Sequence, residues 1–439
     1  MLTPDRFPHL SSTGPFAKQG EQRLTPSHSP NDHQLALAGH NSTLAEKILL
    51  ASSKPFFLGY PINMNTPPEE FFSWRRQLNQ AGIGVDPYNN LGNPDLSSPI
   101  GYNTHEFEKE IILSFSKHFG FLAEDCWGFV SNSGTDSNLH GLYMGRTILT
   151  GRCGVAPKCY FTEDAHYSIQ ILCDLLGLKR VLVEALADGS MDADNLAERL
   201  KENPNQPALV VATTGTTFKG AIDPLDRIHE ILKAKASYVH LDAALFGGYL
   251  PYTEHGADLV LRSNKMAPSP RFDSISISCH KFFGFPSPAG LFMTTQDHFG
   301  EFNQHYSQIH RPEYIGQVPG TITCSRDAVK PAEFYFFSRP AAIARQIKDA
   351  YKILSLCDQL MEQMQSQYAH WGPKRASPVS NIVYFKKPND RIVKKYALAT
   401  MELTIERQKQ KYAHVVIMPH ASSAVLDEFL SDLENDHAG

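Results

Sequence analysis

The sequence contains a run of small polar residues that could bind an anion. The segment Ser131–Asn138 follows an apolar run and opens a stretch of helical pattern. Small hydroxyl residues and a glycine allow backbone N–H groups to converge, and the N-terminus of a helix favours an anion. The pattern indicates a phosphate site, although an ordinary helix cap has the same appearance when the motif stands alone. The chain contains neither a GxGxxG dinucleotide fingerprint nor a GxxxxGKS/T phosphate loop.

Three further polar groups follow apolar runs later in the chain. His166 comes shortly after a run that ends at Phe161, where its ring could stack on an aromatic cofactor. Thr213 belongs to the cluster TTGTT, a composition that is also common in simple turns. Asp242 ends the apolar run in HLDAA, so its carboxylate needs a partner. A protonated pyridine nitrogen is one such partner, and a helix N-terminus or an arginine is another.

A lysine completes this set. Lys281 follows an apolar run and precedes Phe282 and Phe283. Partial desolvation would lower the pKa of its amine, which could then form a Schiff base. Each motif is modest alone, but the order of phosphate site, stacking histidine, acid at a strand end and lysine about forty residues later is jointly specific. These are the parts that an enzyme dependent on pyridoxal 5′-phosphate (PLP) needs.

Short apolar runs alternate with helical stretches between about residues 125 and 300, and these elements must position the polar groups. We predict seven strands, at Trp127–Val130, Lys158–Phe161, Val181–Glu184, Ala208–Ala212, Tyr238–Leu241, Ser274–Ser278 and Gly290–Thr294. We predict helices at Thr135–Leu149, Tyr167–Leu176, Ala193–Glu202 and Arg227–Ala234. This alternation predicts an α/β fold with a mostly parallel sheet, in which ligands bind beyond the carboxyl ends of the strands.

The flanking segments differ in pattern and suggest further domains. We expect an N-terminal arm at 1–54, a helical and substrate-loop segment at 55–125, a large domain at 126–329 and a small C-terminal α+β domain at 330–439. In the last of these, Pro340 marks a kink or restart within a long helical region. Two strands, Asn381–Lys386 and His414–Met418, and a final helix, Ala424–Leu433, are predicted there.

Composition excludes several classes of protein. The chain has 439 residues, of which 42% are hydrophobic and 20% charged, so it can bury a sizeable core. The net charge of −5 (41 − 46) gives no basic excess for nucleic acid. The seven cysteines form no CxxC pair, so neither a metal site nor a disulfide framework is indicated and a reducing, cytoplasmic location is expected. We see no run of apolar residues long enough for a membrane span and no signal-peptide core at the N-terminus.

Taken in order, the motifs resemble those of the group II PLP-dependent amino acid decarboxylases. The resemblance is strongest to bacterial histidine decarboxylases and plant serine decarboxylases and covers about residues 55–435. It rests on WGFV running into SNSGTDSNLHG, and on EDAHYS, TTGTTFKGAIDPLD, HLDAALFGG, SISCHKFFG, TITCSR and AHVVIMP. It implies the type I fold of PLP-dependent transferases, with a seven-stranded large domain and a small C-terminal domain.

The resemblance also implies a role for each matching residue. Lys281 would form the imine with PLP, Asp242 would pair with the pyridine nitrogen and His166 would stack on the ring. Thr213 and Ala244 would flank the ring. The phosphate side would be formed by Ser133, Gly134, Thr135, Ser278 and His280.

Two further segments match regions that relatives place near a subunit interface. Tyr314 stands where the family carries a mobile-loop tyrosine, within a stretch 308–320 whose prolines and glycines predict a loop. Ser325 and Arg326 match a segment that reaches the active site from the partner subunit. The resemblance thus implies a homodimer with shared active sites.

The reaction implied is decarboxylation of an L-amino acid to carbon dioxide and a primary amine. Histidine leads among the substrates on resemblance. Serine, valine, leucine and the aromatic amino acids stay open, because Cys324–Ala328 departs from the usual GSRNG near the substrate side. A PLP-fold transaminase or lyase, or a non-catalytic PLP-fold subunit, is the alternative from another class.

Overall fold

The computed structural model describes residues 51–261, 269–310, 312–405 and 408–436, together with positions 43, 46–48 and 50. The predicted arm at 1–54 therefore lies almost entirely outside the described residues. The chain divides into two compact units, Met1–Ser53 and Lys54–Gly439. The second unit contains all the elements that follow.

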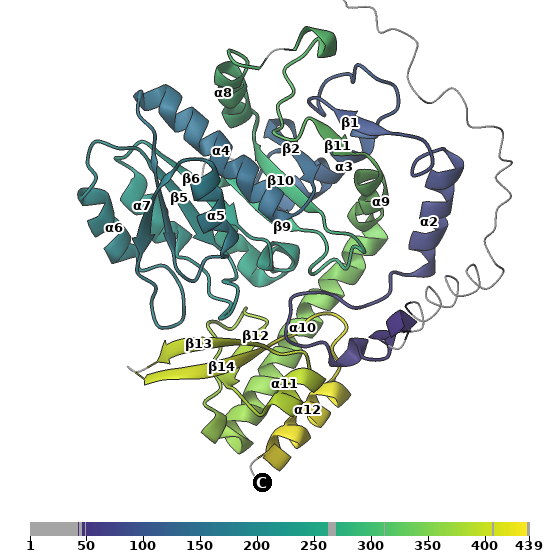
Figure 1. Cartoon of the computed structure of the whole chain (residues 1–439), viewed down its shortest axis with the longest axis vertical. Coiled ribbons are helices and arrows are strands. Elements are labelled where there is room, and N and C mark those ends of the chain that lie inside the picture. The colour runs from purple at the N-terminus through teal and green to yellow at the C-terminus, as the bar shows by residue number, and fades with distance from the viewer. Residues whose placement is uncertain are drawn as a thin grey trace, which may run out of the picture. The chain divides into compact units, whose positions relative to one another are not determined.

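A seven-stranded sheet forms the centre of this unit (Figure 1). In spatial order its strands are β2 (Cys126–Ser131), β10 (Gly290–Thr295), β9 (Ser274–Ser278), β6 (Ser237–Asp242), β5 (Ala208–Thr213), β3 (Lys158–Thr162) and β4 (Lys179–Val183). Strand β10 runs opposite to the other six: it pairs antiparallel with β2 and β9, while β9, β6, β5, β3 and β4 pair in parallel. Each strand overlaps one of the predicted apolar runs, although β4 begins two residues earlier than predicted, and the mostly parallel sheet is confirmed.

Helices cover both faces of the sheet, because side chains along each strand point alternately to opposite faces. In β5, Leu209 and Val211 pack into one hydrophobic cluster, whereas Val210 and Ala212 pack into another. The first cluster includes side chains from α4 (Gly134–Cys153), α5 (Ser168–Leu175) and α8 (Gln296–Tyr306). The second includes side chains from α3 (His105–Ser116), α6 (Ala193–Lys201) and α7 (Leu225–Leu232). Burial on both faces explains why the strands are continuous apolar runs.

The topology brings several polar residues to one edge of the sheet. Thr213, Asp242 and Ser278 are the last residues of the parallel strands β5, β6 and β9. Strand β2 also ends at this edge, because it and β9 are each antiparallel to β10. Helix α4 begins three residues after β2, so its N-terminus lies beside the ends of these strands.

Segments that precede and follow the strands of the large sheet in the sequence pack against one another. These are α2 (Glu69–Gln80), β1 (Asn89–Leu91), β11 (Ser325–Asp327), α9 (Val329–Ser338) and α10 (Pro340–Gln367). Strand β1 pairs with β11, and this pairing joins the turn-rich segment 83–104 to the segment that follows α8. The helical region restarts at Pro340, as predicted, because proline is favoured in the first turn of a helix.

The C-terminal elements correct one prediction. Three strands are present, β12 (Ile382–Lys386), β13 (Ala399–Ile405) and β14 (Gln408–Val416), together with α11 (Asp390–Lys395) and α12 (Ser423–Asp436). Strand β13 was not predicted, and β14 begins at Gln408, earlier than the predicted His414. The missed part is an exposed antiparallel ladder, in which residues such as Lys409 and Lys411 face solvent. Because that ladder buries little apolar surface, it leaves only a weak periodic signal.

Candidate active site

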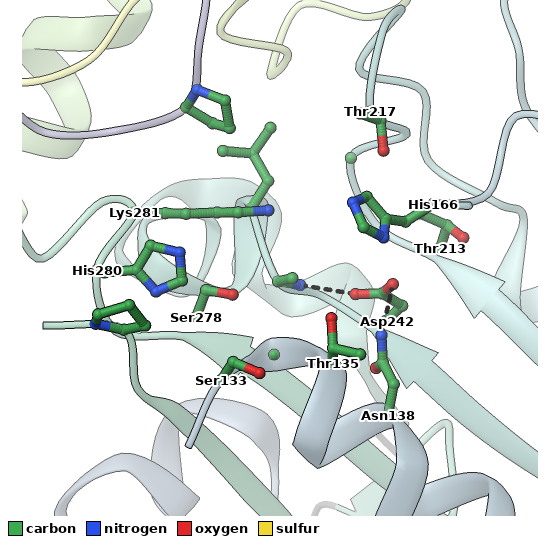
Figure 2. A pocket seen from close by; sticks show the side chains of 16 residues that line it. Ser133, Thr135, Asn138, His166, Thr213, Thr217, Asp242, Ser278, His280 and Lys281 are labelled. Carbon is green, nitrogen blue, oxygen red and sulfur yellow. Dashed lines mark hydrogen bonds between the residues drawn. The ribbon is translucent and has the colours of Figure 1, made fainter. Parts of the chain in front are cut away.

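A cavity of about 240 Å³ opens at the carboxyl edge of the sheet. Ten of the twelve residues that the sequence analysis named for the site line it: Ser133, Gly134, Thr135, His166, Thr213, Asp242, Ala244, Ser278, His280 and Lys281. Figure 2 shows their side chains converging from α4, from the ends of three strands and from the loops that follow. Residues separated by almost 150 positions in the chain thus meet in one pocket.

One end of the cavity is formed by the N-terminus of α4. Ser133 caps this helix and accepts a hydrogen bond from the Asp136 N–H at 3.2 Å. A Cβ on Gly134 would lie 2.5 Å from the Ser278 hydroxyl oxygen, so a larger residue here would force the Ser278 side chain or α4 to shift. The first amides of a helix have no acceptor within the helix. Together with the hydroxyls of Ser133 and Ser278, they can bind an anion.

The opposite end of the cavity is formed by Asp242. Its Oδ1 accepts a hydrogen bond from the Ala244 N–H at 3.1 Å, and its Oδ2 accepts one from the Asn138 amide at 3.0 Å. The carboxylate is 4% exposed, and both bonds are drawn in Figure 2. Donors therefore hold both oxygens from the protein side, while the residue still borders the cavity. An acid held in this way can accept one further N–H from a ligand.

Lys281 reaches into the cavity between these two ends (Figure 2). Burial lowers the pKa of its amine, and the Asp242 carboxylate partly opposes this effect. The loop that carries the lysine is held by Asn63, whose N–H donates to the Lys281 carbonyl at 3.2 Å. The Asn63 side-chain amide also donates to the Phe282 carbonyl at 2.9 Å. A lysine amine with a lowered pKa is suited to imine formation.

His166 lies on the other side of the cavity from Lys281 (Figure 2). Its Nδ1 accepts a hydrogen bond from the Ser168 N–H at 3.3 Å and lies 2.8 Å from the Ser168 hydroxyl oxygen. Burial lowers the pKa of His166, and the Asp242 carboxylate partly opposes this shift. The ring is therefore fixed from its Nδ1 side and can present its flat face to a ligand.

Two named residues do not line the cavity. Tyr314 lies in a short 3-10 turn, Glu313–Ile315, with 83% of its surface exposed. Ser325 begins β11, where its hydroxyl accepts a hydrogen bond from the Asn89 amide at 3.1 Å. The neighbouring Arg326 is buried in an ion pair with Glu108. A catalytic role for Tyr314 and a cofactor-binding role for Ser325 stay predictions.

Comparison with known families identifies the chemistry. The model of the pyridoxal-dependent decarboxylase conserved domain matches residues 149–369, half of the chain, and that segment includes Asp242 and Lys281. The chain belongs to this family. It is therefore a PLP-dependent amino acid decarboxylase, and PLP is its cofactor.

Individual relatives agree with this assignment. The decarboxylase is 28% identical over 394 residues to histidine decarboxylase of Solanum lycopersicum, with 88% of this chain and 86% of the relative covered. It is also 28% identical over 386 residues to serine decarboxylase 1 of Oryza sativa subsp. japonica, with 87% and 72% covered. Among solved structures, L-methionine decarboxylase from Streptomyces sp. 590 superposes with a TM-score of 0.75 at 21% identity, covering 93% and 95% of the two chains.

The residues of the cavity fit PLP. The space beside Gly134 would be filled by any Cβ, and it adjoins hydroxyl groups that suit the phosphate. Among the described residues, the buried hydroxyl of Thr213 has no hydrogen-bond partner, although it borders the cavity. At the far end, Asp242 offers a carboxylate to a ring nitrogen, and Lys281 offers an amine to an aldehyde. The donors and acceptors thus match the cofactor from end to end.

The cavity also includes residues that the sequence analysis gave no role, among them Pro61 and Asn138. Asn138 lies three positions after Thr135 on α4, so helical spacing places both on one face and could have identified it. Pro61 carries no such signal. The segment that contains Pro61 is held by a hydrogen bond to a distant part of the chain, in which the Leu58 N–H donates to the Tyr396 carbonyl at 3.0 Å.

In the described parts of the chain, no helix combines the length and apolar character that a membrane crossing requires.

Proposed function

We propose that this decarboxylase acts on L-histidine and releases histamine and carbon dioxide. The observation that carries the proposal is the similarity, over most of its length, to plant and bacterial histidine decarboxylases. Serine is the second candidate, because serine decarboxylases of Oryza sativa match with the same 28% identity. The fold alone does not choose between them, since a methionine decarboxylase shares it.

Within this function, the ten predicted residues that line the cavity each have a proposed role. Lys281 holds the aldehyde carbon of PLP, and Asp242 holds its ring nitrogen. His166 supports the face of the ring, and Thr213 and Ala244 flank it. The phosphate is held by Ser133, Gly134, Thr135, Ser278 and His280. Bound PLP supplies an electron sink for the electron pair that remains when the carboxylate leaves.

The protein contributes orientation, charge and protons to the reaction. The Asp242 carboxylate favours a protonated ring nitrogen, because an opposite charge stabilises a cation in a buried site. The Lys281 amine, with its pKa lowered by burial, takes and returns a proton more readily than an exposed lysine. After carbon dioxide has left, Tyr314 donates a proton to the substrate Cα from a loop that closes over the site.

The decarboxylase is further proposed to be a homodimer in which each subunit completes the active site of the other. Tyr314 is 83% exposed and Ile309, in the same segment, is 75% exposed, so this region presents apolar surface to a partner. Sedimentation of the purified enzyme at several concentrations should show a dimer. Full activity in a monomeric species would contradict shared active sites. A cytoplasmic location stays a prediction.

A panel of L-amino acids, assayed for carbon dioxide release, tests the proposed substrate. We expect the largest kcat/KM with histidine, by at least about ten-fold over serine, valine, leucine, methionine and the aromatic amino acids. Histamine should form in an amount equal to the carbon dioxide released. A higher kcat/KM with serine would replace histidine by the second candidate, and keto acid formation in place of carbon dioxide would point to transamination.

A further inference from the structure

A chain of buried hydrogen bonds runs from the cavity into the core behind Asp242. The Asn138 amide nitrogen donates to Asp242 Oδ2 at 3.0 Å. The Asn138 oxygen Oδ1 lies 2.9 Å from His240 Nε2 and also accepts a hydrogen bond from the Ser276 hydroxyl. His240 Nδ1 lies 2.8 Å from the Ser274 hydroxyl oxygen. Of the residues in this hydrogen-bonded series, only Asp242 and Asn138 border the cavity.

The direction of these bonds follows from the charge of Asp242. A carboxylate only accepts hydrogen bonds, so Asn138 must turn its NH₂ group toward Asp242 and its oxygen toward His240. An amide oxygen also only accepts, so His240 must carry its proton on Nε2. Burial lowers the pKa of His240 to about 4, so near neutral pH the ring carries a single N–H. Nδ1 is then left to accept from the Ser274 hydroxyl.

Packing leaves these groups little freedom to rearrange. His240 and Ser276 are fully buried, and Asn138 is 2% exposed. In the pairing of β6 with β9, His240 stands opposite Ser274 and Asp242 stands opposite Ser276. Helix α4 lies directly against the histidine ring, since a Cβ on Gly141 would fall 2.2 Å from His240 Nδ1. Two strands and one helix therefore fix the chain of bonds.

We propose that His240 is a positioning residue that acts through Asn138 to hold the Asp242 carboxylate toward the cofactor. This inference rests on the proposed function of Asp242 as the partner of the ring nitrogen. Without the His240 N–H, the Asn138 oxygen keeps the hydrogen bond from Ser276 but loses the one from His240, so the Asn138 amide holds the Asp242 carboxylate less firmly. His240 thereby determines how well Asp242 binds the cofactor, although it does not touch the cavity.

The α4 helix offers a matched control in His140. This second buried histidine is 1% exposed, and burial lowers its pKa to about 3. Among the described residues, neither of its ring nitrogens has a hydrogen-bond partner. Its ring packs among aromatic side chains, such as Phe292 at a centroid distance of 4.7 Å. Replacing His140 changes a buried histidine without breaking the chain of bonds to Asp242.

The test compares PLP binding in His240→Phe, His240→Gln and His140→Phe. We measure the dissociation constant of PLP by fluorescence quenching, and the ¹⁵N shift of bound PLP labelled at the ring nitrogen. His240→Phe should weaken PLP binding by about ten-fold or more, because it removes a donor that supports a buried charge, and should shift the ring-nitrogen signal. His240→Gln, whose amide can still donate to Asn138, should stay within about three-fold of the parent, as should His140→Phe.

Two further measurements keep the proposal open to refutation even if His240→Phe does not fold. In the parent apoenzyme, ¹⁵N spectra of labelled histidine should show His240 as the Nε2–H tautomer, and an Nδ1–H tautomer would overturn the proposal. Asn138→Ala should reproduce the loss of PLP affinity. Equal losses in His240→Phe and His140→Phe would reduce His240 to a packing residue.

Failure of the proposed function gives a different result. In that case Asp242→Asn would leave both PLP affinity and the ring-nitrogen signal unchanged. If Asp242→Asn alters both and His240→Phe alters neither, Asp242 keeps its role and the inference about His240 is wrong.

Discussion

The Asp242 end of the cavity is formed entirely within one chain, whereas the described segment around Tyr314 does not reach the cavity. At the Asp242 end, Asn138 of α4 and the Ala244 N–H in the loop after β6 donate to the two carboxylate oxygens. Tyr314 is 83% exposed and does not border the cavity. The buried end is thus preorganised within the fold, whereas the exposed segment can act only if it moves or meets a partner.

This difference has a physical basis in the two chemical tasks. Holding a charged ring nitrogen requires a fixed carboxylate in a site with little water, where electrostatic interactions are strong. Delivering a proton after carbon dioxide has left requires a group that arrives late and then lets the product leave. A rigid sheet edge suits the first task and an exposed loop suits the second. Substitutions at the two places should therefore fail in different ways.

The largest effect is expected at the buried end, from Lys281→Ala. This change removes the amine that we propose holds the PLP aldehyde, so the absorbance of the imine near 420 nm and the activity should both be lost. Borohydride reduction of the parent enzyme followed by peptide mapping should label Lys281. The exposed Lys348 on α10 provides the control, since Lys348→Ala should keep both signals. Labelling of a different lysine would refute the assignment.

A smaller effect is expected at the exposed segment, from Tyr314→Phe. The ring is kept and only the hydroxyl is lost, so PLP affinity should match that of the parent enzyme. If the hydroxyl donates the proton to Cα, kcat should fall by about 10²–10⁴, the usual range for general acid catalysis. Tyr351→Phe, at a tyrosine that is 55% exposed on α10, is the matched control. Unchanged turnover in Tyr314→Phe would leave this tyrosine as a passive surface residue.

The same comparison explains what could be predicted from sequence. Asp242, Lys281 and the α4 N-terminus were predictable, because apolar strands reveal where they end and ligands bind at those ends. Asn138 and His240 received no role, because their importance lies in contacts between α4, β6 and β9 that no local pattern records. The place of Tyr314 in a loop could be predicted from the prolines and glycines of segment 308–320. The proposed approach of Tyr314 to the substrate requires a movement or a partner, which no local sequence pattern records.

A third contrast lies within α4, between Asn138, which is hydrogen-bonded, and His140, whose ring nitrogens have no hydrogen-bond partner in the described part of the chain. Burial places the pKa of His140 at about 3 in the folded state, against 6.5 for an exposed histidine. Between these values the unfolded chain binds more protons, so the free energy of unfolding rises with pH. Stability from a neutral His140 is thus complete above pH 6.5 and is lost as the pH falls toward 3, with a slope of up to about 1.4 kcal/mol per pH unit.

His140→Leu should remove this pH dependence while leaving the cofactor contacts in place. As the pH falls from 7.5 to 5, the urea midpoint of the variant should rise relative to that of the parent. This change is measured from the difference between the two proteins at pH 7.5. His310→Leu, at an exposed position after α8, is the control and should change the midpoint by the same amount at both pH values. A parallel pH dependence in His140→Leu and the parent would mean that His140 is not the neutral, desolvated group that its surroundings indicate.

PLP affinity gives the second measurement, because His140 packs against aromatic rings and not against the chain of bonds to Asp242. The variant should therefore bind PLP as the parent does, so that acid stability and cofactor binding separate within a single helix.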